Sequence, residues 1–204
     1  MQDLLRNGDF VRLGDVVEGF QYGLNAAAKP YDGENKYIRI TDIDDQSRQF
    51  LENDLSSPTG FLTNDYLLQE NDIVFARTGA STGKSYLYTP DDGKVYFAGF
   101  LVRSRVKSMY DSRFVFYQTQ SDRYKNWVQI MSLRSGQPGI NAKEYAQYTF
   151  NCPSKPEQTR IADMLTAADK KIQTERDYLA KLQNIKSGLM QDLFTNDVSV
   201  DTLL

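Results

Sequence analysis

The chain has 204 residues, of which 40% are hydrophobic and 12% aromatic, a composition typical of an ordered globular protein. It has no histidine and one cysteine, Cys152, which excludes internal disulfides, cysteine-based metal sites, Ser/His triads and most zinc sites. There is neither an apolar run long enough to span a membrane nor a signal-peptide pattern, so we expect a cytoplasmic protein.

The net charge of -3 is unevenly distributed along the chain. Residues 1–75 carry 6 basic and 14 acidic side chains, whereas residues 98–143 carry 8 basic and 2 acidic ones. Because aromatic residues such as Tyr110 and Trp127 lie among these basic residues, the segment is a candidate phosphate-contacting surface. The alternative is an amphipathic segment whose aromatic side chains are core and whose charges are solvated.

Residues 1–152 are predicted to form a compact mixed domain. Alternation and β-forming residues indicate strands at "KYIRITDI" (36–43), "NDIVFART" (71–78), "SYLYT" (85–89) and "KVYFAGFLVRSRV" (94–106), the last bent at Gly99. Apolar residues at steps of three and four then predict one helix from Asp111 to Met131, with Asp111 or Ser112 as its N-cap. "SGQPGIN" (135–141) is typical of a loop, and "YAQYTFNCP" (145–153) of an extended segment.

Residues 153–204 are predicted to contain one long helix. Ser154 and Glu157 have capping-box spacing, and Pro156 falls in the first turn, where its missing N–H costs little. From there to Phe194 the apolar residues form a heptad seam with two polar members. The seam consists of Ile161, Leu165, Ala168, Ile172, Glu175, Leu179, Leu182, Lys186, Leu189 and Leu193. Such a seam favours pairing with a second helix, and the alternative is a helix that folds back onto its own domain.

The two polar seam positions indicate the direction of pairing. In a parallel homodimer Glu175 would face Glu175 and Lys186 would face Lys186. In an antiparallel pair whose facing residue numbers add up to about 361, Glu175 meets Lys186 and Leu179 meets Leu182. The sequence therefore predicts antiparallel pairing through residues 165–193.

The segment "TGASTGKS" (78–85) superficially suggests a phosphate-binding loop. Only three residues separate Gly79 from Gly83, Thr78 stands where the first glycine should be, and a strand follows instead of a helix. The segment is more typical of a tight glycine turn that presents Arg77, Thr78, Ser81, Thr82 and Lys84. The adjacent acids Asp44 and Asp45 are expected to be solvated, so we predict neither a metal site nor a catalytic site.

Five blocks together resemble the DNA-specificity subunits of type I restriction-modification systems. They are "YIRITDI" (37–43), "NDIVFARTGASTGK" (71–84), "FAGFLVRSRV" (97–106), "RSGQPGIN" (134–141) and "PSKPEQTRIADML" (153–165), the last followed by "KSGLMQDLF". Such subunits have two target-recognition domains, each followed by a long helix, and the two helices pair antiparallel. Each domain reads half of a bipartite DNA sequence. Methyltransferase and translocating restriction subunits perform the chemistry.

This chain resembles half of such a subunit. The resemblance implies an α+β fold in which residues 1–152 are the target-recognition domain and residues 153–204 are the spacer and dimerisation helix with a C-terminal tail. It implies a non-catalytic chain that binds no cofactor itself, with S-adenosylmethionine on the methyltransferase partner. A homodimer, a pairing with another half and a fragment of a longer gene all remain open.

The DNA-binding candidates come from the two glycine loops and the basic strand. They are Arg77, Ser81, Thr82, Lys84, Arg103, Arg105, Arg134, Ser135, Gln137 and Asn141. In this hypothesis the basic residues contact phosphates and polar loop residues reach base edges. Alternatively the family-typical blocks build the scaffold, and the specifying residues lie within 20–35, 44–66 or 107–126.

The resulting functional prediction is recognition of double-stranded DNA on behalf of methyltransferase and restriction subunits. A homodimer formed through the C-terminal helix would read an interrupted palindrome. The alternative is a dimeric interaction module that scaffolds a methyltransferase without touching DNA.

Overall fold

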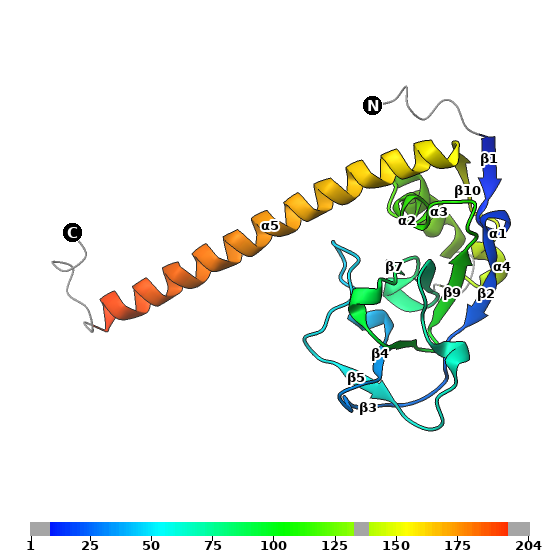
Figure 1. The fold of residues 1–204 in the computed structure, drawn as a ribbon. Helices are drawn as coiled ribbons and strands as arrows, with labels where there is room; N and C mark the ends of the chain where they lie inside the picture. The colour runs from blue at the N-terminus through cyan, green and yellow to red at the C-terminus, as the bar shows by residue number, and fades with distance from the viewer. Residues whose placement is uncertain (1–8, 133–138, 196–204) are drawn as a thin grey trace. The chain divides into compact units, whose positions relative to one another are not determined.

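The computed structural model describes residues 9–132 and 139–195, and these residues form an α+β fold with a long C-terminal helix (Figure 1). The strands are β1 Asp9–Arg12, β2 Val17–Tyr22, β3 Ala28–Pro30, β4 Lys36–Ile38, β5 Ser56–Pro58, β6 Asp72–Ala76, β7 Ser85–Leu87, β8 Val95–Phe97, β9 Leu101–Val106 and β10 Thr149–Cys152. The α-helices are α1 Leu13–Val16, α2 Ser112–Gln118, α3 Asp122–Ser132, α4 Ala142–Tyr145 and α5 Lys155–Phe194. The predicted fold class is therefore confirmed.

The chain divides into two compact units, Met1–Ala162 and Asp163–Leu204. The first two turns of α5 thus belong to the first unit, while the predicted domain boundary at residue 152 precedes the helix. In the described part of the chain, no helix is long and apolar enough to cross a membrane.

A four-stranded antiparallel sheet in the order β2-β9-β6-β7 is the centre of the first unit. Strand β6 is buried along its whole length, and after Asp72 its residues are apolar. Its alternating side chains face two cores, because successive residues of a strand point to opposite sides. Ile73 and Phe75 pack with the aromatic residues of α2, α3 and β10, whereas Val74 and Ala76 pack with β4, β8 and the residues around them.

Three two-stranded pairs surround the central sheet. Strands β1 and β10 pair antiparallel, as do β3 and β5, whereas β4 and β8 run parallel. The predicted strand at 94–106 is two strands in different sheets, β8 and β9, and the chain turns between them at residues 98–100. The bend expected at Gly99 is therefore confirmed.

Two expected element bounds are wrong. The predicted strand at 36–43 ends at Ile38, and a 3₁₀ turn follows at Ile40–Asp42, where the Asp42 carboxylate accepts a hydrogen bond from the Arg39 N–H at 2.8 Å. The segment expected to be extended from residue 145 begins inside α4.

The predicted helix from Asp111 to Met131 is two helices, α2 and α3. The break follows from side chains that bond to the backbone at Thr119 and Ser121. The Asp111 carboxylate caps α2 as predicted, because it accepts from the N–H groups of Arg113 and Phe114.

Asp111 also ties the beginning of α5 to the domain. The Thr159 hydroxyl donates to the Asp111 carboxylate at 3.0 Å, and the buried Gln158 side chain accepts from the Asp111 N–H at 3.0 Å. The Gln158 amide also donates to the carbonyl of Pro153 at 2.8 Å. These polar contacts fix the first turns of α5 on the first unit.

Two buried tyrosines donate hydrogen bonds to backbone carbonyls in and beside the glycine turn at 78–84. The Tyr145 hydroxyl donates to the Ala76 carbonyl at 2.6 Å, and the Tyr124 hydroxyl donates to the Gly83 carbonyl at 3.0 Å. Gly83 has a φ of +86°, and a Cβ atom there would lie 2.5 Å from Cγ1 of Val128. Only glycine fits this position.

We expect the substitution Gly83→Ala to destabilise the chain by at least about 2 kcal/mol in the free energy of unfolding, because it combines an unfavourable φ with a collision in a packed core. Chemical denaturation measures this change. Gly79→Ala is the matched control, because Gly79 has a φ of +71° and open space around it.

Gly79→Ala should lower the free energy of unfolding by only about 1 kcal/mol, since backbone strain is its only cost. Adding Val128→Ala to Gly83→Ala should cost less than the sum of the two single changes. An equal loss of unfolding free energy in Gly79→Ala and Gly83→Ala would contradict the collision of the new Cβ atom with Val128.

Candidate nucleic-acid interface

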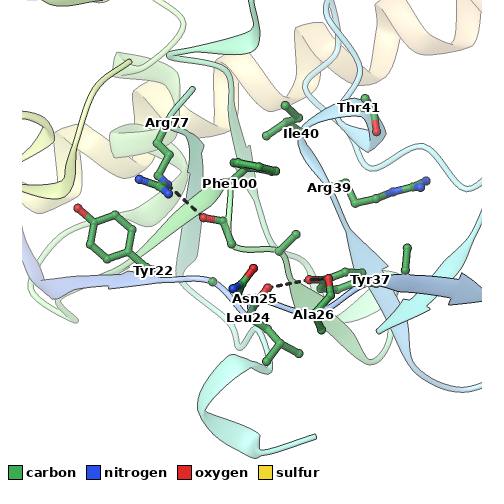
Figure 2. A pocket seen from close by; sticks show the side chains of 14 residues that line it. Tyr22, Leu24, Asn25, Ala26, Tyr37, Arg39, Ile40, Thr41, Arg77 and Phe100 are labelled. Atoms are coloured by element: carbon green, nitrogen blue, oxygen red, sulfur yellow. Dashed lines mark hydrogen bonds between the residues drawn. The ribbon is translucent and has the colours of Figure 1, made fainter. Parts of the chain in front are cut away.

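An open groove of about 600 Å³ lies on the first unit, between the segment after β2 and the bend between β8 and β9 (Figure 2). Its lining comes from four segments that are distant in the sequence. The residues with the largest side chains are Tyr22, Leu24, Asn25, Tyr37, Arg39, Ile40, Thr41, Arg77 and Phe100. Among the described residues that line the groove, none is acidic. An electron-rich ligand therefore suits it.

Arg77 is the predicted site residue that lies in this groove. It follows β6, and its backbone is held on both sides: its N–H donates to the Phe100 carbonyl at 3.0 Å, and its carbonyl accepts from the Ile140 N–H at 2.9 Å. Its Nε donates to the Gly99 carbonyl at 3.1 Å, and its Cζ lies 5.0 Å from the ring centre of Tyr22 (Figure 2). The guanidinium is thus fixed in position before any ligand binds.

Arg39, the second arginine of the groove, is already paired. Its Nε and Nη2 both donate to the Asp42 carboxylate at 2.8 Å. Donating these hydrogen bonds to the carboxylate raises the pKa of Arg39. Arg39 therefore brings less unbalanced positive charge to the groove than Arg77 does.

The segment after β2 forms the wall of the groove opposite Phe100. This wall is rigid because its backbone approaches β8 closely. The Leu24 N–H donates to the Phe97 carbonyl at 2.8 Å, and the Tyr37 hydroxyl donates to the Leu24 carbonyl at 2.7 Å. A Cβ atom at Gly23 would lie 2.1 Å from the carbonyl oxygen of Ala98. Residue 23 must therefore be glycine for the wall to form.

The predicted site residues of the first loop lie in two different pockets. Arg77 lines the groove, whereas Ser81, Thr82 and Lys84 line a second pocket of about 200 Å³. The Thr82 hydroxyl donates to the Gly79 carbonyl at 2.7 Å within the turn. Lys84 is only 8% exposed, and its ammonium donates to the Ile43 carbonyl at 3.0 Å and pairs with Asp45 at 2.5 Å. The turn does not present Lys84, contrary to the expectation.

The predicted contact residues of β9 have an internal partner. The carboxylate of Asp72, with no exposed surface, accepts from Nε and Nη2 of Arg105 at 2.8 and 3.0 Å, and Arg103 lies 3.7 Å from it. Arg103 also donates to Gln21. Burial lowers the pKa of Arg103, whereas the hydrogen bond with Asp72 raises that of Arg105. These two arginines hold the sheet together, and a role in contacting phosphates stays a prediction.

The second predicted loop is described only at its end. Arg134, Ser135 and Gln137 lie outside the described residues. Asn141 is exposed and caps α4, where its side chain accepts from the Glu144 N–H at 3.1 Å. A bridge between Thr78 and Gly139 brings the end of this loop to the first loop.

Tyr22, Asn25 and Phe100 were not among the predicted site residues. Tyr22 and Asn25 fall within the window 20–35 that the alternative hypothesis named, whereas Phe100 belongs to a block assigned to the scaffold. The signal that could have found Phe100 is a large aromatic side chain directly after Gly99 at a predicted bend. Within residues 9–132 and 139–195, no group of acidic and cysteine side chains could hold a metal ion.

Comparisons with known proteins agree with this architecture. Residues 7–184 match the family model described as type I restriction modification DNA specificity domain. A curated relative, the type I restriction enzyme MjaVIII specificity subunit of Methanocaldococcus jannaschii, is 23% identical over 192 residues, which are 93% of this chain and 42% of the relative.

Two solved structures share the fold. The S subunit of a type I restriction-modification system from M. genitalium has a TM-score of 0.64 and 14% identity, over 94% of this chain and 47% of that one. The HsdS subunit from Thermoanaerobacter tengcongensis has a TM-score of 0.59 and 14% identity, over 95% and 46%. The chain spans less than half the length of these relatives.

We expect Asp72→Asn to lower the free energy of unfolding by about 2 kcal/mol or more, because it leaves the guanidinium of Arg105 without a counter-charge beside a buried amide. Thermal or chemical denaturation measures the change. The matched control is Asp122→Asn, which removes an exposed ion pair of 3.2 Å with Lys125 and should cost well under about 1 kcal/mol. A loss no larger than that of the control would refute this role of Asp72.

Proposed function

Since the chain belongs to the type I restriction modification DNA specificity family, we propose that it recognises one half of a two-part DNA sequence and catalyses no reaction itself. The observation that carries this proposal is the groove on the first unit, in which a fixed guanidinium stands among aromatic and amide side chains with no acidic neighbour in the described lining. Such a surface suits the acceptor-rich edges of bases.

The proposed partners rest on the family to which the chain belongs. In this proposal a methyltransferase subunit, which would bind S-adenosylmethionine, modifies an adenine at the recognised site, and a translocating restriction subunit cleaves DNA. Phosphate contacts from basic side chains position the chain on the duplex and make its binding depend on salt.

The helical unit supports pairing with a second copy. Ile172, Leu179, Leu182 and Leu189 are between 44% and 55% exposed, so the seam of α5 is available to another helix. In an antiparallel pair these side chains bury one another, and Glu175 gains Lys186 of the second copy. Glu175 already pairs with Lys171 of its own helix at 2.7 Å, so the layer would join three charges.

When the chain is the only specificity protein expressed beside its methyltransferase, we expect methylated adenines at an interrupted palindrome. A two-fold homodimer carries the same reader twice, and the helix pair sets the gap. Methylome sequencing measures the motif. An asymmetric motif would overturn the homodimer.

A binding assay provides the control for this experiment. It measures which sequences from random duplex DNA the chain retains, with and without the methyltransferase. Sequence-selective retention supports recognition by this chain. Its absence under both conditions would favour the alternative, a dimeric scaffold that does not contact DNA.

Disulfide cross-linking tests the direction of pairing. In chains that carry Cys152→Ser, a mixture of Leu179→Cys and Leu182→Cys variants should cross-link several-fold more than Leu179→Cys alone, because these two positions face each other only in the antiparallel register. Non-reducing electrophoresis measures the dimer. Preferential same-site cross-linking at residue 179 would indicate parallel pairing.

A further inference from the structure

The guanidinium of Arg77 has an unused donor edge. Its Nε donates to the Gly99 carbonyl at 3.1 Å and its plane lies over Tyr22, but among the described residues no acceptor engages its two terminal amino groups. Two parallel donors on a fixed plane match the N7 and O6 acceptors of guanine in the major groove. A phosphate would also accept from them but would not need a fixed orientation.

Phe100 adds an apolar side chain to the groove that holds this donor edge. Its side chain is 58% exposed, although its carbonyl accepts from the Arg77 N–H at 3.0 Å. In Figure 2 the Phe100 ring lies between Arg77 and Ile40, which also lines the groove. The apolar group that a base pair displays in the major groove is the C5-methyl of thymine.

The backbone that carries Phe100 is fixed. The bend at 98–100 is held by the hydrogen bond from the Leu101 N–H to the Ala98 carbonyl at 2.8 Å, and by the bridge between Leu24 and Ala98. An exposed aromatic side chain on a fixed bend costs little entropy when it contacts a ligand. A fixed cation and an apolar side chain in one groove suit two neighbouring bases of different chemistry.

We propose that the groove reads a guanine with a thymine next to it on the same strand, Arg77 donating to N7 and O6 of the guanine and Phe100, with Ile40, contacting the thymine methyl. This inference rests on the proposed DNA recognition. It deepens that function by naming the base pairs and the side chains that distinguish them.

Base analogues test the two contacts separately in duplexes that contain the recognised half-site. For the unsubstituted chain, with its methyltransferase where binding requires it, 7-deazaguanine at one guanine should weaken binding about tenfold, because it removes N7. Deoxyuridine in place of the neighbouring thymine should weaken binding about fourfold, because it removes one methyl group.

Variants assign each effect to a side chain. Arg77→Lys should abolish the 7-deazaguanine effect and keep the deoxyuridine effect, and Phe100→Ala should do the reverse. Arg123→Lys is the matched control for the arginine, because Arg123 also lies over a ring, 4.7 Å from that of Phe10, and its Nε donates to the Thr149 carbonyl at 3.1 Å. Phe61→Ala is the control for the aromatic residue, because Phe61 is 89% exposed. Both controls should keep both effects.

Three results would overturn the inference. The first is a half-site without a guanine next to a thymine. The second is base-analogue effects that survive Arg77→Lys and Phe100→Ala. The third is a uniform loss of affinity across all sequences in Arg77→Lys with a smaller salt slope, which would identify a phosphate contact. In each case sequence-selective binding by the unsubstituted chain would leave the proposed function standing, and the lack of any selective binding would remove both.

Discussion

The buried carboxylate of Asp72 is the interaction on which the central sheet depends. It begins β6 and accepts hydrogen bonds from Arg105 of β9, which fixes the register of the two strands from Asp72 opposite Arg105 to Ala76 opposite Leu101. A slip of one residue would reverse which face each side chain of β6 occupies, and both faces are core. Arg77 directly follows β6 in the sequence. The register of β6 and β9 therefore determines where Arg77 lies in the groove.

Much of the fold could be predicted because its signals are local. The apolar runs of β6 and β7, the bend at Gly99 and the proline-free heptad of α5 are all visible in the sequence. The break between α2 and α3 was missed because neither proline nor glycine marks it. It depends in part on a tertiary contact, the 2.6 Å hydrogen bond between the hydroxyls of Thr119 and Ser85. The short pairs β1–β10 and β3–β5 also depend on contacts between distant segments.

The candidate site was only partly predictable for the same reason. Arg77 follows a clear strand and precedes a glycine turn, so its loop position could be inferred. The basic side chains of β9 and Lys84 could not be judged from charge alone, because their partners Asp72, Asp45 and the Ile43 carbonyl come from elsewhere in the chain. A basic segment in a sequence does not by itself indicate unbalanced charge on the surface. Tyr22 and Phe100 are brought to Arg77 by the pairing of β9 with both β2 and β6.

The groove is lined largely by the connections that follow β2, β4 and β8, rather than by the interior of any strand. Exposed side chains such as Asn25, Thr41 and Phe100 can therefore be exchanged without breaking the hydrogen-bond ladder of the central sheet. If the groove reads DNA as proposed, stability and specificity are carried by largely separate sets of residues. A lineage with this architecture would then acquire a new target sequence through a few surface substitutions while its buried framework stays the same.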